Sequence, residues 1–311
     1  MSIIINVSSL TKQFKDVKAV DNLSFTVNQS DVYGFLGQNG AGKSTTIRML
    51  LTLIEPTDGE IEMFGLNLRS HRKEVLRQVG AIIERPDLYK YLSGYENLNL
   101  FAKMNGVDSS RKRLMEQLEL VGLADRGHSK AKTYSQGMKQ RLGIAIALVH
   151  DPQLVILDEP TNGLDPQGIA DMRNLILHLS RHMNKTVMVS SHLLSEIEQV
   201  ATRMLIINKG KKIVEGSVEE LIDPAKTTVS LETTDVASAL QFIKNSKWNT
   251  CLSKPVTENI LLEMHKEDIP VFNRDLVHAG IGVSSLQPKN SLENYFLDVT
   301  AGKQHVGTFK D

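Results

Sequence analysis

The sequence is poor in cysteine and in net charge, and each absence excludes a class of protein. Cys251 is the single cysteine among 311 residues, so no disulfide can form within the chain, which fits a reducing compartment. The 36 basic and 36 acidic residues cancel, and this balance favours neither nucleic acid nor an anionic lipid surface as a partner. We therefore expect a cytoplasmic protein that binds no nucleic acid.

Long apolar runs and targeting signals are also missing. The longest apolar stretches, such as residues 142–149, are far shorter than the roughly 20 residues that a membrane-spanning helix needs. No charged segment followed by an apolar one begins the chain, and there is no internal repeat or low-complexity tract. We expect a chain that does not cross a membrane, so that any role at a membrane requires a partner.

Length and periodicity predict two domains. The first covers residues 1–222 and contains a helical subdomain at about 88–150, where apolar residues recur at three- and four-residue intervals. Strands are predicted at residues 3–10, 23–27, 32–36, 60–64, 79–83, 154–157, 187–189, 205–208 and 211–215. The runs at 154–157 and 187–189 are apolar throughout, which is typical of strands buried on both faces of a parallel sheet.

The chain changes character near Asp223, and residues 225–311 are predicted to form a small α+β accessory domain. Its predicted strands are 227–232, 250–253, 259–264 and 282–288, and its predicted helices are 236–245, 269–278 and a short one at 291–297. The order β-α-β-β-α-β resembles a ferredoxin-like unit. Since this region holds no glycine-rich loop and no carboxylate pair after a buried strand, we expect it to tune partner docking or dimer geometry.

A glycine loop joins a predicted strand, 32–36, to a predicted helix, 46–54. Its residues are Gly37, Gln38, Asn39, Gly40, Ala41, Gly42, Lys43, Ser44 and Thr45. Such a loop turns backbone N–H groups toward one anion at a helix start, while the lysine reaches the outer phosphates and the serine holds Mg²⁺. An ordinary glycine-rich turn is the alternative, but the full G-x-x-x-x-G-K-S spacing and its context favour nucleotide phosphates.

Two carboxylates, Asp158 and Glu159, follow the buried strand at 154–157. Carboxyl ends of parallel strands share one edge of a sheet, so these side chains are expected beside the glycine loop. Asp158 is predicted to hold Mg²⁺, and Glu159 to orient and deprotonate the attacking water. The alternative is a pair of helix-capping acids before Pro160.

A second small-residue turn, Ser135-Gln136-Gly137, opens a helix-patterned segment. On its own it predicts an N-cap, with Ser135 supplying the oxygen. Its position between the glycine loop and Asp158 changes that interpretation: the chain resembles the ATPase subunit of an ATP-binding cassette (ABC) transporter, in which this turn is the signature loop. The resemblance runs from about Ile3 to Leu221 and implies a P-loop NTPase fold of the α/β class with a helical subdomain.

The resemblance assigns further roles. Phe14 stands where the family stacks an aromatic ring on adenine, with Val20 packing nearby, although Phe14 could also be a core residue that closes a strand. The loop ending at Asp165 corresponds to the family's dimer-crossing loop and would otherwise be interpreted as a turn. His192 matches the switch histidine at the γ-phosphate, whereas a lone histidine is ordinarily structural.

Glu84 departs from the family pattern. Most members place there a glutamine that contacts Mg²⁺, after a strand corresponding to residues 79–83. With a glutamate at this position, the chain resembles the subgroup of the family that exports, or confers immunity to, bacitracin and lantibiotic peptides. Glu84 is therefore predicted as a third metal ligand beside Ser44 and Asp158, with a solvated surface glutamate as the alternative.

The resemblance implies an ATP- and Mg²⁺-dependent ATPase that forms a head-to-tail homodimer. Ser135 and Gly137 of one copy would face the glycine loop of the other. It also implies a separate membrane permease, docked near residues 85–104 at the inner face of the membrane, and export of peptide antibiotics, drugs or other amphipathic substrates. The rival is a non-transport ATPase of the same superfamily acting on ribosomes or DNA. Two cassettes or a long coiled coil would mark such proteins, and neither is present in the sequence.

Overall fold

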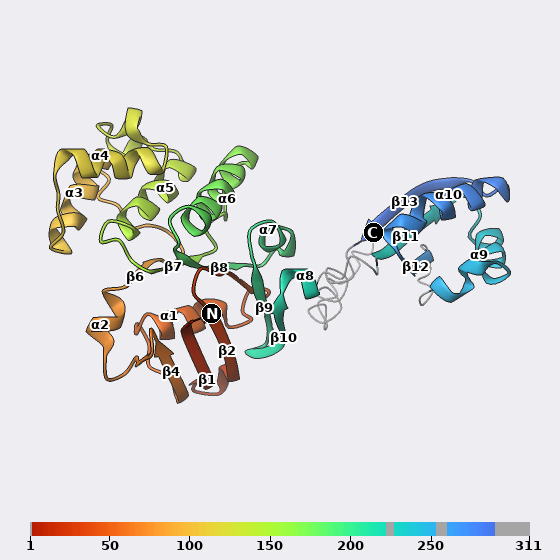
Figure 1. Ribbon diagram of the computed structural model, residues 1–311, viewed down its shortest axis with the longest axis horizontal. Helices are drawn as coiled ribbons and strands as arrows, with labels where there is room; N and C mark the ends of the chain where they lie inside the picture. Colours follow the sequence, from red (N-terminus) through yellow and green to blue (C-terminus); the bar gives the residue numbers. More distant parts are fainter. Residues whose placement is uncertain (1, 222–226, 253–259, 290–311) are drawn as a thin grey trace, which may run out of the picture. The chain divides into compact units, whose positions relative to one another are not determined.

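The computed structural model describes residues 2–221, 227–252 and 260–289. The chain divides into two compact units, Met1–Gly216 and Ser217–Asp311 (Figure 1). The helix predicted at 291–297 lies outside the described residues. Within the described ranges, no helix combines the length and the apolar character needed to cross a membrane.

The first unit contains an antiparallel sheet in the order β2-β1-β4-β5. Its strands are β1 (Ile3–Phe14), β2 (Val17–Asn28), β4 (Asp58–Met63) and β5 (Leu66–Asn67). The first two are longer than the predicted strands at 3–10 and 23–27, because they continue to a tight turn at Lys15, whose φ is 47°. The strand β4 begins two residues before the predicted strand at 60–64, so that it includes Asp58 and Gly59.

The central sheet has the order β10-β9-β3-β8-β7-β6. Its strands are β3 (Val32–Leu36), β6 (Val79–Ile82), β7 (Leu154–Asp158), β8 (Thr186–Ser191), β9 (Arg203–Asn208) and β10 (Lys211–Ser217). The strands from β9 to β6 pair in parallel. Every residue of β3, β7 and β8 is buried, which confirms the prediction of a parallel sheet covered on both faces.

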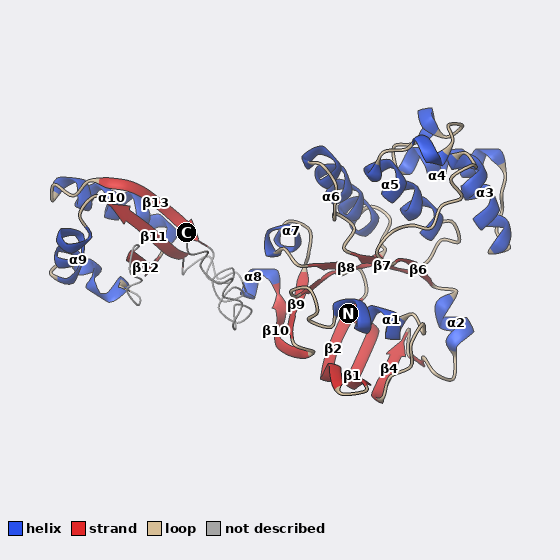
Figure 2. Ribbon diagram, turned by 180° about the vertical axis from the view of Figure 1, so that it is seen from behind, coloured by secondary structure: helices blue, strands red, loops and turns tan. Residues whose placement is uncertain are grey.

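Helices cover the two faces of the central sheet (Figure 2). The helix α1 (Lys43–Leu50) lies between the two sheets, where Ile47, Met49 and Leu50 join a core built from strands of both. On the other face α6 (Pro166–Arg181) and α7 (Leu194–Glu198) contact β3 and β8. A small helix, α2 (Arg72–Leu76), contacts β6.

The predicted helical subdomain is formed by three helices that contact one another. They are α3 (Gly94–Met104), α4 (Arg111–Leu120) and α5 (Gln136–Ala147), joined by the 3₁₀ turns Ala124–Arg126 and Ala131–Thr133. Ser93 and Glu96 form a capping box that fixes the start of α3. The helix α5 contacts β6 and so joins the subdomain to the central sheet.

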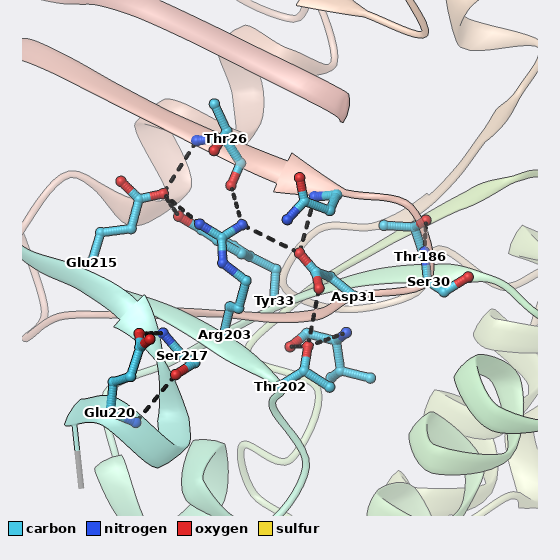
Figure 3. Close-up of polar contacts among 12 residues, drawn as sticks. Thr26, Ser30, Asp31, Tyr33, Thr186, Thr202, Arg203, Glu215, Ser217 and Glu220 are labelled. Carbon is cyan, nitrogen blue, oxygen red and sulfur yellow. Dashed lines mark hydrogen bonds and ion pairs between the residues drawn. The ribbon is translucent and has the colours of Figure 1, made fainter. Parts of the chain in front are cut away.

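A polar network lies at the amino ends of β3 and β9 (Figure 3). The Arg203 guanidinium contacts Asp31 at 3.4 Å and Glu215 at 3.7 Å. Glu215 also accepts hydrogen bonds from the Tyr33 hydroxyl at 2.8 Å and from the Thr26 N–H at 3.2 Å. These bonds tie β10 to β2, β3 and β9 at the end of the sheet opposite the glycine loop.

The second unit has a three-stranded antiparallel sheet in the order β12-β11-β13. Its strands are β11 (Thr227–Thr233), β12 (Ile260–Met264) and β13 (Val283–Lys289); its helices are α8 (Val218–Leu221), α9 (Val236–Lys244), α10 (Ile269–His278) and the 3₁₀ turn Lys266–Asp268. The predicted helices at 236–245 and 269–278 are both present. The apolar residues of β11 and β12 pack with those of α9 and α10 in a separate core.

The strand predicted at 250–253 is wrong at its first two residues. Residues Lys247–Cys251 form a 3₁₀ helix, whose first turn is capped by Ser246. Leu252 forms an isolated antiparallel bridge with Leu262 of β12, and residue 253 lies outside the described residues. Trp248 is buried there and its indole N–H donates to the Asp275 carboxylate at 3.0 Å, so this tertiary contact overrides the local strand preference. Among the described residues the unit therefore has three strands where the ferredoxin-like pattern has four.

Candidate functional site

The glycine loop ends in a helix start that no side chain caps. Gly42 is the N-cap of α1 and has a φ of 106°, and as a glycine it has no side chain to accept from the first turn of the helix. A Cβ atom at Gly42 would lie 2.6 Å from the Ala19 carbonyl oxygen, so only glycine fits. The uncapped N–H groups of α1 are therefore free to bind an anion.

A cavity of about 140 Å³ opens over this helix start. It is lined by Ala19, Gln38, Asn39, Gly40, Gly42, Lys43, Ser44, Thr45 and Glu159. The structure thus brings most of the predicted phosphate-binding residues together with one of the two predicted carboxylates. The surroundings suit a nucleotide phosphate, because the donors belong to the backbone and to a lysine.

Lys43 is only 4% exposed. Its ammonium donates to the Gly37 carbonyl at 2.6 Å and to the Gln38 carbonyl at 3.3 Å, and it pairs with Glu159 Oε1 at 3.1 Å. A buried ammonium requires such partners. The cation is therefore held at the wall of the cavity and directed toward the predicted catalytic carboxylate.

Asp158 ends β7 and is almost fully buried. Its Oδ1 accepts from the Ser190 hydroxyl at 2.5 Å, whereas its Oδ2 is buried without a hydrogen-bond partner. An unpaired buried carboxylate oxygen is costly, and a hard cation with oxygen ligands would satisfy it. Asp158, together with the hydroxyl of Ser44, fits the predicted Mg²⁺.

Glu159 and His192 follow neighbouring parallel strands, β7 and β8. His192 Nδ1 lies 3.0 Å from Glu159 Oε2. The Glu159 backbone has a positive φ of 47°, and its N–H donates to Ser190 Oγ at 2.9 Å. The two predicted catalytic side chains are therefore in contact, and Lys43 binds the second oxygen of the same carboxylate.

Glu84 does not lie with the other predicted metal ligands. Its carboxylate accepts from Arg48 Nη2 at 2.6 Å, its side chain is 65% exposed, and it does not line the cavity described above. Its φ of 59° turns the chain at the end of β6. The arrangement matches the surface alternative, and a Mg²⁺ contact by Glu84 stays a prediction.

The two residues predicted at the adenine differ in exposure. Phe14 ends β1 and is 46% exposed, with the Lys12 ammonium 4.9 Å from its ring centroid. Val20 is fully buried, and a Cβ atom added at Gly42 would lie 3.5 Å from its Cγ2. Phe14 therefore has a free surface for stacking, whereas Val20 supports the loop from the core.

Ser135 and Asp165 are helix caps in the folded chain. Ser135 accepts from the Met138 N–H at 3.2 Å at the start of α5, and Asp165 accepts from the Gly168 N–H at 3.0 Å at the start of α6. A Cβ atom at Gly137 would meet only Leu164, at 3.8 Å. These residues are predicted to contact the nucleotide that is bound at the glycine loop of a second copy of the chain, and these contacts stay predictions.

The sequence did not predict three residues that contact the predicted site residues or line the cavity. Ser190 holds both Asp158 and the Glu159 backbone, Ala19 lines the cavity, and Arg48 binds Glu84. Only Ser190 had a detectable signal, since it is a polar residue at the end of an apolar strand that precedes His192. The other two positions depend on contacts between distant segments.

Known proteins resemble this chain over most of its length. The family model described as ABC transporter matches residues 20–162. The bacitracin transport ATP-binding protein BcrA of Bacillus licheniformis is 42% identical over 303 residues, which cover 97% of this chain and 99% of that protein. The lantibiotic transport ATP-binding protein SrtF of Streptococcus pyogenes is 41% identical over 212 residues, which cover 68% of this chain and 90% of that protein.

A solved structure supports the same fold. The ATP-binding cassette MJ0796, a dimer in a post-hydrolysis state bound to ADP and phosphate, matches with a TM-score of 0.62 and 24% identity over 69% of this chain and 99% of that one. The glycine loop, the paired carboxylates and the full-length relatives agree with this fold. The chain belongs to the ATP-binding subunits of ABC transporters, a family of ATPases.

Proposed function

We propose that the cavity at α1 binds the phosphates of ATP and that Glu159 activates the attacking water. The backbone N–H groups of the glycine loop and the Lys43 ammonium would neutralise phosphate charge, and Ser44 and Asp158 would hold Mg²⁺. When bound, the metal supplies positive charge to the outer phosphate oxygens. The observation that carries this proposal is the contact of one carboxylate, Glu159, with both Lys43 and His192.

These residues would orient the attacking water and stabilise the charge on the phosphates. Phosphoryl transfer to water needs an in-line nucleophile and a compensated phosphate charge more than covalent catalysis. Glu159 would accept the proton of the water, and His192 would hold that carboxylate through Nδ1 while its other nitrogen faces the γ-phosphate. ATP must also replace Glu159 as the partner of Lys43, which frees the carboxylate for this role.

A second copy of the chain would complete the site. Ser135 and Gly137 open α5, and Asp165 opens α6. Helix starts attract phosphate, so a head-to-tail dimer would close the nucleotide between two such starts. The homodimer would then depend on ATP.

The partner and substrate are proposed from the relatives. BcrA and SrtF are named for bacitracin and lantibiotic transport, so we assign this chain to export of peptide antibiotics or similar amphipathic molecules through a separate permease. Residues 85–104 would dock that permease, since Tyr89, Tyr91 and Met104 are exposed there. The chain would then lie on the inner face of the membrane. Neither of these relatives supports the rival role on ribosomes or DNA.

A protection assay tests this function. A bacitracin-sensitive host would produce the chain together with the membrane subunits encoded beside it. We expect a higher inhibitory concentration of bacitracin or of a lantibiotic, lost with Glu159→Gln at equal protein level. If the complex forms and hydrolyses ATP but protects against neither class of peptide, the substrate assignment is wrong while the ATPase assignment holds.

A further inference from the structure

Glu196 joins two loops on either side of the proposed catalytic pair. Its Oε2 accepts hydrogen bonds from Thr161 Oγ1 and from Ser191 Oγ, both at 2.8 Å. Thr161 follows Glu159 by two positions, and Ser191 directly precedes His192. One carboxylate oxygen on α7 therefore connects the segment after β7 to the segment after β8.

Both hydroxyls are part of the backbone turns that carry the catalytic side chains. Ser191 is 3% exposed, and its Oγ also accepts a hydrogen bond from the Leu193 N–H at 3.0 Å. This bond joins the residues on either side of His192. The Thr161 carbonyl accepts from the Leu164 N–H at 3.1 Å, and the Glu159 carbonyl accepts from the Asn162 N–H at 3.1 Å. A movement of either hydroxyl would therefore move Glu159 or His192.

The surroundings of Glu196 favour strong, lasting bonds. Glu196 is half-buried and lines a cavity of about 20 Å³ together with Arg173 and the apolar residues Pro160, Ile169, Ile176 and Val200. Hydrogen bonds to a charged oxygen are short and strong, and an apolar environment strengthens them further.

We propose that Glu196 is a positioning residue for ATP hydrolysis. It fixes Thr161 and Ser191 relative to each other and so keeps His192 Nδ1 within 3.0 Å of Glu159 Oε2. This inference rests on the proposed roles of Glu159 and His192. Because Glu196 does not line the phosphate cavity, its loss should lower kcat and leave the KM for ATP unchanged.

Two substitutions separate positioning from charge. Both hydroxyls donate to the same oxygen, so Glu196→Gln can keep an acceptor in that place, whereas Glu196→Leu has a similar volume and no acceptor. We expect Glu196→Leu to lower kcat about tenfold to a hundredfold, as small misplacements of catalytic groups do. Glu196→Gln should stay within about threefold of wild type. Ser195→Ala, on the same helix and exposed, serves as the matched control.

A double-mutant cycle keeps the test valid if Glu196→Leu also destabilises the fold. Thr161→Val removes one of the two bonds to Glu196 and should lower kcat in the wild-type background but not in Glu196→Leu. Wild-type kcat in Glu196→Leu, or equal losses in the leucine and glutamine variants, would overturn the inference. Full independence of the hydroxyl and Glu196 substitutions would do so as well.

The variant Glu159→Gln, measured in parallel, distinguishes a failure of the Glu196 proposal from a failure of the proposed catalytic pair. If Glu159→Gln is inactive while Glu196→Leu turns over normally, only the role of Glu196 is wrong. If Glu159→Gln keeps wild-type turnover, the proposed catalytic pair itself is wrong.

Discussion

The two ends of the central sheet use similar polar side chains in opposite ways. At the amino ends of β3 and β9, the carboxylates of Asp31 and Glu215 share Arg203 and several other donors. At the carboxyl ends, Asp158 keeps one buried oxygen without a partner beside the phosphate cavity. Satisfied networks stabilise a fold, whereas unsatisfied buried groups cost stability and mark functional sites.

The largest expected effect is at the carboxyl end. Glu159→Gln should lower the turnover of ATP by about two to four powers of ten, because the amide cannot take the proton of the attacking water. ATP binding should persist, and the ATP-bound dimer should accumulate. Steady-state hydrolysis and size-exclusion chromatography with ATP measure both effects, and wild-type turnover would rule out Glu159 as the base.

Lys43→Ala should act on binding as well as on hydrolysis. Removing a charged donor that faces the phosphates should weaken the affinity for ATP·Mg²⁺ roughly tenfold to a hundredfold. Equilibrium titration with a fluorescent ATP analogue measures this directly. An unchanged affinity would contradict the placement of the phosphates at α1.

Tyr33→Phe tests the amino end. The loss of the 2.8 Å bond to Glu215 should lower the free energy of unfolding by about 1 kcal/mol without changing turnover per folded molecule. Burial, and then the Glu215 carboxylate, raise the pKa of Tyr33 well above its usual value. The unfolded tyrosine ionises near pH 10 while the folded one stays neutral, so the wild type loses stability above about pH 10.

The phenylalanine variant cannot lose stability through that ionisation. The difference in unfolding free energy between the two proteins should therefore shrink as the pH rises above about 10. Urea unfolding at pH 8 and at pH 10.5 measures it. A constant difference would contradict a neutral, buried Tyr33.

Glu84→Gln should have the smallest effect. Its exposed pair with Arg48 contributes at most about 1 kcal/mol to stability, and ATP binding should stay intact. We expect the dependence of hydrolysis on Mg²⁺ concentration, and the stimulation by the membrane subunits, to change. Superimposable rate curves for both proteins would leave Glu84 as a surface partner of Arg48 only.

Local patterns predicted the carboxyl end of the sheet well. The glycine spacing, the apolar strands and the residues after them place Lys43, Asp158, Glu159 and His192 at one edge, because parallel strands end together. The bonds of Ser190 and Glu196 could not be predicted, since they join segments about 30 residues apart in the sequence. The pairing of Glu84 with Arg48 depends equally on tertiary structure.

The amino end and the second unit were less predictable. Arg203 and Asp31 pair although they are 172 positions apart in the sequence, and no local motif predicts such a pair. In the second unit the helices followed from their periodicity, but the region around Trp248 did not, because its conformation depends on Asp275. Motifs predict sites whose residues are close together in the sequence, whereas the contacts of a buried network depend on the folded structure.

The central claim, that catalysis and stability are divided between the two ends of the sheet, is tested most directly by one paired measurement. ATP turnover and urea unfolding would be measured on the same samples of Glu159→Gln and Arg203→Leu. We predict that Glu159→Gln loses turnover with little change in unfolding. We predict that Arg203→Leu loses about 2–4 kcal/mol of stability at normal turnover per folded molecule, because it leaves Asp31 without its cation and Glu215 paired with Lys212 alone. Loss of turnover in folded Arg203→Leu, or unchanged turnover in Glu159→Gln, would contradict it.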